Sequence, residues 1–352
     1  MKAGTKVVVL LAAMLLGLPQ RSTSREAFAQ SAAHGLQFKF TPGQPLTYAI
    51  STRMNLDRRA NLESERTKVD FTLRYNVRLT PKAEAKAGIT TWTLSTSDIE
   101  GDWDIGGAAG NIVLRIRGPH MTGTQNGNVI IDTQKDIGTA QAKEFRKKIA
   151  ALSMSGEMDL DSRGNIKDIR GEMPFVDFWK EANEGSVGFF GIIFPEKPVA
   201  QGSSWTENAS LKKMGDIQLE GEGLRCTVTF TRQPDTTLQG KPVALFKTSA
   251  PFDQKNLIGN LLQVGQTTRI SIPTFRRKAA GEARFDQQKG LLLDSDLKID
   301  ADASMNAVVQ GQQLNMDMTI QAGIALKFVP EGAAKPAPVK PAPPPLGTPA
   351  TP

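Results

Sequence analysis

The stretch Leu-Asn-Met-Asp-Met-Thr-Ile-Gln-Ala-Gly-Ile-Ala-Leu-Lys-Phe, residues 314–328, alternates without a slip. Every even-numbered residue in it is apolar, whereas the odd-numbered residues are polar, charged or small. A period of two is typical of a β-strand with one buried and one solvated face. At about 3.3 Å per residue the strand would be roughly 50 Å long, well beyond the usual length of about five or six residues.

A second stretch with the same alternation lies just upstream, at residues 291–305. Apart from Leu292, its leucines and isoleucine share one parity with Ala301, Ala303 and Met305, and four aspartates with Lys298 hold the other parity. Gln310, Gly311 and Gln312 lie between the two stretches, where a turn belongs. We therefore expect a long antiparallel hairpin, bent or bulged in places, with one apolar face that another part of the protein must cover.

Shorter alternating segments extend this pattern over most of the chain. The clearest is 69–79, and others lie at 46–56, 89–94, 112–116, 224–230, 243–246, 269–272 and 281–286. The predicted fold class is mainly β, with long bent antiparallel strands that form a large curved sheet or two half-barrel units.

Helical spacing replaces the alternation in a few places. Apolar side chains recur every three or four residues in 139–152, and 174–183 begins with Pro174, which suits a first helical position. Residues 257–264 are a shorter third candidate. We expect two or three helices packed on the concave side of the sheet.

The first residues have the pattern of a signal peptide. Lys2 and Lys6 precede an apolar run at 7–18 that is too short to span a bilayer. Ala27-Phe28-Ala29 forms a small-residue cleavage site, so the mature chain is expected to begin near Gln30. The expected destination is the periplasm or the extracellular space.

The chain divides into four parts on this interpretation. They are a signal peptide at 1–29, a first β-rich half at 30–195 with the helices near 139–152 and 174–183, a second β-rich half at 196–330, and a disordered Pro/Ala-rich tail at 331–352. Residues 156–161 and 281–286 both read Gly-Glu-x-x-apolar-Asp, and each is followed by a basic-Gly turn. The same hairpin is either used once per half or repeated by coincidence.

Composition narrows the classes of partner. The formal net charge of +7 is spread among interspersed acids and bases, so no nucleic-acid partner is expected. Cys226 is the single cysteine and shares parity with the apolar residues around it, which predicts a small buried side chain without a disulfide.

Catalytic and metal motifs are weak. Of the two histidines, His34 lies near the expected mature N-terminus and His120 in a Gly-Pro loop without a matching nucleophile. Asp159, Asp161 and Asp168 resemble the start of a calcium loop, but the fifth and twelfth positions are arginines, so a simple turn is the preferred interpretation. We expect no enzyme, no metal and no cofactor.

The densest apolar cluster occupies residues 175–194. It is interpreted either as a plug that fills the concave face or as the lining of a pocket for an apolar ligand. Together with the middle of the long strand, it supplies the candidate cavity residues: Phe175, Phe178, Trp179, Phe189, Phe190, Ile192, Met316 and Met318.

Four short features resemble a family of uncharacterised secreted bacterial β-rich proteins. They are the Gly-x-x-x-x-Tyr opening at 43–48, the connector Phe-Pro-Glu-Lys-Pro-Val-Ala-Gln-Gly-Ser-Ser-Trp at 194–205, the strand at 281–286 and the Lys-Gly-Leu turn at 289–291. Ser203 departs from the acidic residue common in that connector. The resemblance implies no catalytic residue. More loosely, long bent strands closed by helices are similar to the half-barrels of periplasmic lipoprotein carriers, an analogy of fold alone.

Three classes of function compete on this reading. The first is a non-catalytic envelope protein that binds an apolar or amphipathic ligand, such as a lipid, between sheet and helices. The second is a structural or adaptor protein of the envelope with a filled core and a tail that contacts the envelope. The third is a hydrolase, which the lack of a nucleophile and base arrangement disfavours.

Overall fold

A computed structural model describes residues 36–61, 66–85, 88–107, 110–135, 137, 155–170, 190–211, 213–214, 217–238, 240–263, 266–309 and 312–331. These residues form seventeen strands of one antiparallel sheet. The strands are β1 Leu46–Ala60, β2 Thr67–Ala85, β3 Ile89–Gly106, β4 Ile112–Arg117, β5 His120–Gln125, β6 Asn128–Asp132, β7 Ser155–Asp161, β8 Ile166–Arg170, β9 Ser204–Leu211, β10 Lys213–Met214, β11 Ile217–Leu219, β12 Leu224–Arg232, β13 Thr236–Leu238, β14 Lys241–Gln263, β15 Gln266–Asp286, β16 Leu291–Val309 and β17 Gln312–Val329.

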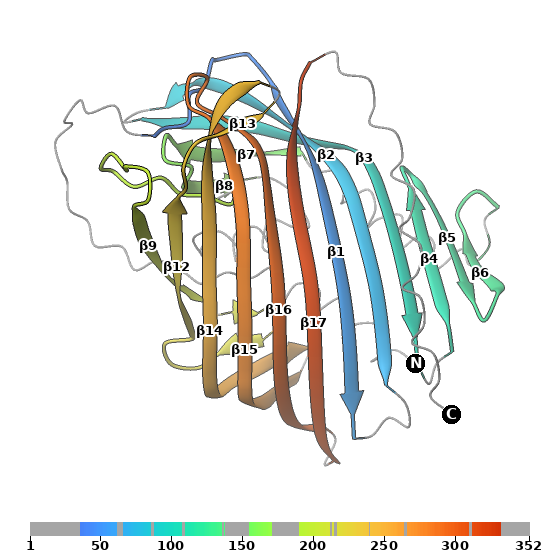
Figure 1. Ribbon diagram of the computed structural model, residues 1–352. Helices are drawn as coiled ribbons and strands as arrows, with labels where there is room; N and C mark the ends of the chain where they lie inside the picture. Colours follow the sequence, from blue (N-terminus) through green and yellow to red (C-terminus); the bar gives the residue numbers. More distant parts are fainter. Residues whose placement is uncertain are drawn as a thin grey trace, which may run out of the picture.

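Seven long strands make the body of the sheet, in the order β14, β15, β16, β17, β1, β2, β3. They run side by side in Figure 1, with β4, β5 and β6 beyond β3 and with β12 and β9 beyond β14. Strand β1 pairs with both β2 and β17, so the first and last strands of the chain are neighbours. At the upper end of the view, the start of β3 also pairs with β7, which continues into β8.

The long hairpin expected from the sequence is confirmed as β16 and β17. Its register pairs Ala301 with Ile320 and Ala303 with Met318, and the apolar parity of β17 supplies the buried residues Met316, Met318, Ile320 and Leu326. Because β17 continues this parity from one end to the other, its even-numbered residues all face the inner side of the curved sheet.

The sequence led us to expect two or three helices on the concave side of the sheet. This expectation is wrong for the described residues, none of which is helical. Residues 139–152 and 174–183 lie outside the described ranges. Residues 257–263 belong to β14, where Leu257 and Gly259 are buried and Ile258 is exposed. A short apolar run has the same composition in a helix and a strand, and pairing with β15 decides the outcome here. Within the described ranges, no helix is long and apolar enough to cross a membrane.

Local irregularities bend the sheet. Asn256 has a φ of 57°, and the β14–β15 pairing skips both Asn256 and Pro273. Proline has no N–H to donate, and asparagine tolerates the left-handed conformation. The hydrogen bonds between β14 and β15 are therefore interrupted at these two residues, and the strands bend there. A register shift between Arg74 and Asn76 breaks the β2–β3 pairing in the same way. The strands therefore curve and enclose one face.

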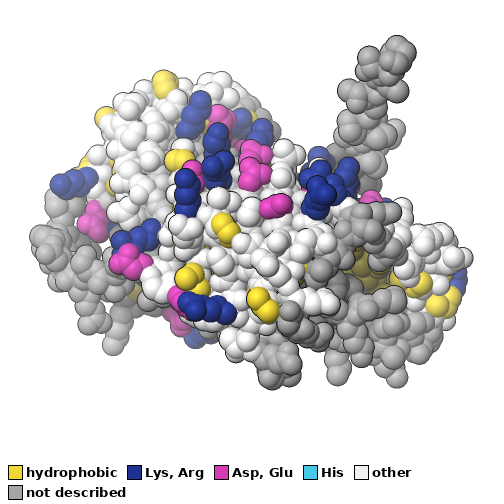
Figure 2. Space-filling view, turned by 90° about the horizontal axis from the view of Figure 1, so that it is seen from below, with side chains coloured by type: hydrophobic (Ala, Val, Ile, Leu, Met, Phe, Trp, Pro, Cys, Tyr) yellow, Lys and Arg dark blue, Asp and Glu magenta, His cyan; other side chains and the backbone are white. Residues whose placement is uncertain are grey.

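The outer face is solvated. Cross-strand ion pairs join Arg276 to Asp253 at 3.5 Å and Arg284 to Asp294 at 3.1 Å, and Ser304 donates a hydrogen bond to Asp317 at 2.7 Å. Figure 2 shows acidic and basic side chains interspersed over the visible surface, with only scattered hydrophobic ones. The buried hydrophobic residues of the described strands, such as Ala301 and Met318, lie on the opposite, inner face.

Candidate functional site

Small side chains gather in the middle of the inner face. One cross-strand row of the sheet holds three alanines, and each of the next two rows adds one more. We call this group the alanine zone; it consists of Ala250 on β14, Ala279 on β15, Ala301 and Ala303 on β16, and Ala322 on β17. Each alanine contributes one methyl group, so this part of the face leaves more room above the sheet than leucine or phenylalanine would.

Two arginines flank the alanine zone on the same inner face. Arg58 follows Met54 and Leu56 on the buried parity of β1 and is only 5% exposed. Arg277 lies between Phe275 and Ala279 on the buried parity of β15 and is 7% exposed. In the part of the chain that the structure describes, they are the two basic side chains in the buried set.

The two guanidinium groups occupy different surroundings. Arg58 donates a hydrogen bond from Nη2 to Thr67 Oγ1 at 3.3 Å, next to the edge of the β1–β2 pairing. Burial lowers the pKa of Arg277 to about 10, with a smaller opposing effect from the Cys226 thiol. At that pKa the side chain still carries a positive charge at neutral pH. The inner face therefore combines apolar surface with buried positive charge.

Aromatic side chains fill the other end of the inner face. This group, called here the aromatic plug, comprises Phe38, Tyr48, Phe190, Phe194, Phe246 and Phe285, each at most 4% exposed. Its rings are in direct contact: Phe38 stacks on Phe190 with centroids 4.5 Å apart, and Phe194 meets Phe285 edge-on at 4.8 Å. The Tyr48 hydroxyl donates to the Leu292 carbonyl at 3.2 Å, and burial raises the pKa of Tyr48. This end of the face is packed.

Two similar turns hold Phe38 in the aromatic plug. Asp161 accepts a hydrogen bond from Arg163 N at 3.0 Å, and Asp286 accepts one from Gln288 N at the same distance. The chain segment at Phe38 runs between the turns: Phe38 N donates to Ser162 O at 2.8 Å, and the next residue's N–H donates to Gly290 O at 3.0 Å. The repeated motif of the sequence thus forms two turns of the same kind, and both accept backbone hydrogen bonds from the segment that carries Phe38.

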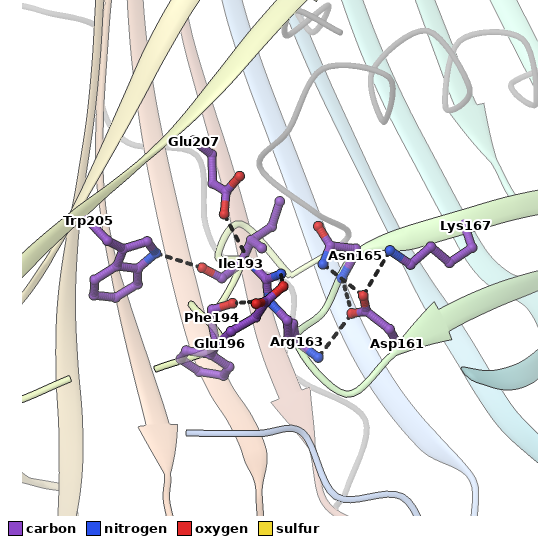
Figure 3. Close-up of polar contacts among 9 residues, drawn as sticks. All are labelled: Asp161, Arg163, Asn165, Lys167, Ile193, Phe194, Glu196, Trp205 and Glu207. Atoms are coloured by element: carbon purple, nitrogen blue, oxygen red, sulfur yellow. Dashed lines mark hydrogen bonds and ion pairs between the residues drawn. The ribbon is translucent and has the colours of Figure 1, made fainter. Parts of the chain in front are cut away.

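Arg163 binds the connector, residues 194–205, whose first residue, Phe194, belongs to the aromatic plug (Figure 3). Its Nε donates to the Phe194 carbonyl at 2.5 Å, and its Nη groups pair with Glu196 at 3.0 Å and Glu207 at 3.1 Å. Trp205 adds a hydrogen bond from Nε1 to the Ile193 carbonyl at 2.9 Å. We call this group the latch, and it makes the β7–β8 turn, the connector and β9 one structural unit.

A surface pocket of about 430 Å³ lies beside the latch and is lined by the connector and the start of β9. Its charged residues include Arg163, Glu196 and Glu207, which are engaged with one another. These three side chains belong to the latch, so they already hold the connector in place.

The structure separates the sequence-predicted cavity residues into two groups. Phe190 and Ile192 are fully buried at the aromatic plug, whereas Met316 and Met318 lie on the inner face of β17, where Met318 pairs with Ala303 of the alanine zone. Ten residues of β1 separate the two places, about 33 Å of strand. Phe175, Phe178, Trp179 and Phe189 lie outside the described residues. The four described candidates are buried as expected, but they do not form one pocket.

Among the described residues, no group of three His, Cys, Asp or Glu side chains is placed to hold a metal ion. His120 is exposed at the start of β5. In the calcium-like segment, Arg170 pairs with Asp159 at 2.7 Å and with Asp168 at 2.9 Å. Arg170, which stands where the calcium pattern requires a glutamate, is therefore a structural partner of two of its acids.

Arg58 and Arg277 are the site residues that sequence reasoning missed. Arg58 continues the apolar parity of β1, and extending that alternation past Leu56 would have found it. Arg277 follows a register shift between Ser271 and Thr274, so the inner residues change from even numbers at Ile272 to odd numbers at Phe275. No pattern in the sequence marks that shift, apart from Pro273 inside a strand.

No family model and no curated protein matches this chain. Among solved structures, one of lipid-protein interactions in lipovitellin shows 12% identity and a TM-score of 0.42 over 85% of this chain. The chain spans 27% of the length of that protein.

Two further solved structures come from bacteria. The translocator domain of the autotransporter NalP from Neisseria meningitidis shows 7% identity and a TM-score of 0.20 over 83% of this chain and 91% of its own. OccK5 from Pseudomonas aeruginosa shows 7% identity and a TM-score of 0.21 over 84% and 99%. At these scores the likenesses carry no argument about function, which has to come from the inner face itself.

Proposed function

We propose that this protein is an exported, non-catalytic binding protein whose alanine zone holds an apolar or amphipathic ligand. The observation that carries the proposal is the contrast within one inner face. Large aromatic rings fill one end, whereas five alanines line the middle of the longest strands. Ligand sites of this kind are concave and mostly apolar, with a few placed polar groups.

The test is binding of an apolar fluorescent probe to the full chain and to a pair of matched variants. Ala279 faces inward and Ala280, its neighbour on β15, faces solvent. Ala279→Trp is expected to fill the alanine zone and to reduce probe binding at least about tenfold, whereas Ala280→Trp leaves it unchanged. Absence of probe binding, or an equal effect of both variants, contradicts the proposal.

A structural protein of the envelope with a filled core is the second candidate. The aromatic plug and the latch favour it, because aromatic rings are stacked in the plug and a part-buried hydrogen bond holds Phe194 in place. Lipid extraction from purified protein, followed by mass spectrometry, separates the two. A stoichiometric co-purified lipid supports the binding protein, and a clean extract together with no probe binding supports the structural protein.

Export is part of the proposal and has its own test. The proposal rests on the Ala27-x-Ala29 cleavage pattern behind an apolar run. N-terminal sequencing of protein recovered from the periplasm or the culture fluid is expected to begin near Gln30. An intact Met1 on that protein contradicts export through a cleaved signal peptide.

A further inference from the structure

Residues 36–40, which contribute Phe38 to the aromatic plug, lie outside the seventeen strands. The even-numbered residues of this segment pack against the buried core, whereas Gln37 and Lys39 are exposed. That alternation is typical of an extended chain with one buried side. In the part of the chain that the structure describes, no strand pairs with the segment. We call these five residues the strap.

Two turns hold the strap from opposite sides. The Phe38 N–H donates to the Ser162 carbonyl at 2.8 Å, and the Lys39 N–H donates to the Gly290 carbonyl at 3.0 Å. Successive N–H groups of an extended chain point in opposite directions, so the strap passes between the β7–β8 turn and the β15–β16 turn. Lys39 Nζ adds a hydrogen bond to the Gln288 carbonyl at 3.1 Å. The two turns therefore act as a clamp.

A glycine in each turn gives the strap its room. A Cβ at Gly164 would lie 2.7 Å from Cε2 of Phe38, and a Cβ at Gly290 would lie 2.6 Å from the backbone nitrogen of Lys39. Neither contact is possible unless the strap or the turn moves. The two glycines also have φ angles of 90° and 63°, in the left-handed region that favours glycine. The basic-Gly turn that the sequence repeats is thus shaped for the strap at both of its places.

The socket that receives Phe38 is held together by contacts that do not involve the strap. Phe194 meets Phe285 edge-on at 4.8 Å and Phe246 at 5.5 Å. The Phe194 backbone also exchanges hydrogen bonds with Arg163 of the latch (Figure 3). Phe285 is fixed by its place in β15, which pairs with strands on both sides. Departure of the strap would therefore leave a formed apolar socket.

The strap is attached more weakly than the strands are. Strand β1 pairs along its length with both β2 and β17, whereas two backbone hydrogen bonds join the strap to the described residues. Segments with few hydrogen bonds open locally at a free energy below that of global unfolding. Burial of the Phe38 ring favours the closed state, so release is a minor but accessible excursion.

We propose that residues 36–40 are a releasable strap that fills, in the same molecule, a preformed site for an extended Phe-x-Phe segment. The strap leaves this site while the strands remain paired. The site consists of two turn carbonyls, which accept from consecutive N–H groups, and the socket, which takes the first phenylalanine. Its occupant is the chain's own strap, and a peptide of the same sequence replaces it. This proposal goes beyond the proposed function and does not depend on a ligand in the alanine zone.

The first experiment supplies the strap as a peptide to the full chain. A labelled peptide of residues 36–41, Leu-Gln-Phe-Lys-Phe-Thr, is titrated by fluorescence anisotropy with wild type, Phe38→Ala and Phe275→Ala. Phe38→Ala empties the socket, whereas Phe275→Ala empties a buried place elsewhere on β15. The peptide is expected to bind Phe38→Ala at least about tenfold more tightly than the other two proteins. A peptide with alanine for its first phenylalanine should bind none of them.

The second experiment measures release in the intact protein and serves if Phe38→Ala does not fold. Amide hydrogen exchange at Phe38 and Lys39 is expected to be at least about tenfold faster than in the middle of β1. Gly290→Ala, which presses on Lys39, should raise the exchange of the strap amides about tenfold further and leave β1 unchanged. Gly221→Ala is the matched control, because Gly221 has a φ of 66° but open space around it.

The opposite results contradict the proposal. Strap amides that exchange only as fast as those of β1 overturn independent release. No peptide binding by folded Phe38→Ala overturns the preformed site, and equal binding by all three proteins shows general surface attraction. Equal exchange in the two glycine variants contradicts the clamp. None of these results bears on probe binding at the alanine zone, so the proposed function stands or falls separately.

Discussion

The aromatic plug and the alanine zone are two parts of one inner face, built on the same strands and the same alternation. In the plug, rings from Phe38, Phe190 and Phe194 contact one another at 4.5 to 5.2 Å. In the alanine zone the inward positions carry methyl groups and two flanking arginines. Alternation therefore decides which side chains face inward, whereas their size decides how much volume each of them fills on the inner face.

The largest expected effect comes from placing a charge on the inner face. Met316→Asp is expected to cost about 3–5 kcal/mol of unfolding free energy, because its neighbours across the strands are Ala60 and Met305. Met318→Asp should cost about 1–3 kcal/mol less, since Met318 lies opposite Arg58 and the new carboxylate can pair with that side chain.

Urea melts of both variants measure the difference, with Asp317→Ala on the solvated face as the control at under about 1 kcal/mol. Equal costs at the two methionines would mean that Arg58 does not reach the surface of the alanine zone. If Asp317→Ala were the only variant that lowers the free energy of unfolding, the buried and solvated faces of β17 would be assigned the wrong way round.

The latch is expected to stabilise the aromatic plug by holding Phe194 in place. Arg163→Met removes the hydrogen bond to the Phe194 carbonyl and leaves Glu207 without its arginine, so we expect a loss of about 2–3 kcal/mol. Faster amide hydrogen exchange at Phe194 should accompany the loss, since that N–H donates to the Arg163 carbonyl. Arg225→Met, at an exposed pair with Glu222, is the control and should cost under about 1 kcal/mol. A latch variant as stable as this control contradicts the role.

The same enlargement in both regions tests the difference in packing. Ala283 is buried between Phe285 and Gly281 on β15, at the edge of the aromatic plug. Ala283→Leu is expected to cost about 1–3 kcal/mol through overpacking, and Ala301→Leu in the alanine zone less than about 1 kcal/mol. Thermal and urea unfolding of the two variants give the comparison. Equal costs would show that the alanine zone is packed as tightly as the plug.

The smallest expected effect concerns pH at the β7–β8 hairpin. Hydrogen bonding from Arg170 lowers the pKa of Asp159. A folded-state pKa below the unfolded one means that the ionised carboxylate stabilises the fold above its ordinary pKa, and that this contribution is lost as the pH falls. Arg170→Met should therefore be less stable than the wild type near pH 6, with a difference that shrinks toward about pH 3. Lys247→Met, at an exposed pair with Glu282, is the control and should change the stability by less than about 1 kcal/mol.

The sequence predicts the fold best where one pattern runs unbroken. The alternation in β16 and β17 predicted the hairpin and its buried face because no irregularity interrupts β17. The prediction failed at 257–263, where a short apolar run without clear period was read as a helix. The pairing of β1 with β17 was beyond any local pattern, since it joins residues at opposite ends of the chain.

The candidate site was predictable only in part. Burial of Phe190, Ile192, Met316 and Met318 followed from their apolar character, but their separation along the face depends on the register of the whole sheet. Arg277 could not be placed, because the parity of β15 changes at an irregularity that the pairing with β16 creates. The sequence also does not show where small side chains gather on the inner face. The five alanines come from four different strands, and only the register of the sheet brings them together.

The pairing of β1 with β17 has a consequence for how the chain folds. Thr47 finds its partner at Val329, so one side of β1 stays open until almost all of the chain is present. Contacts between such distant residues close slowly, because the entropy of a very long loop is lost before the pairing repays it. During that delay β1 and β2 present an apolar face and an unpaired edge, the features from which aggregation starts. We expect refolding to be slow and sensitive to protein concentration, with the last strand as the closing step.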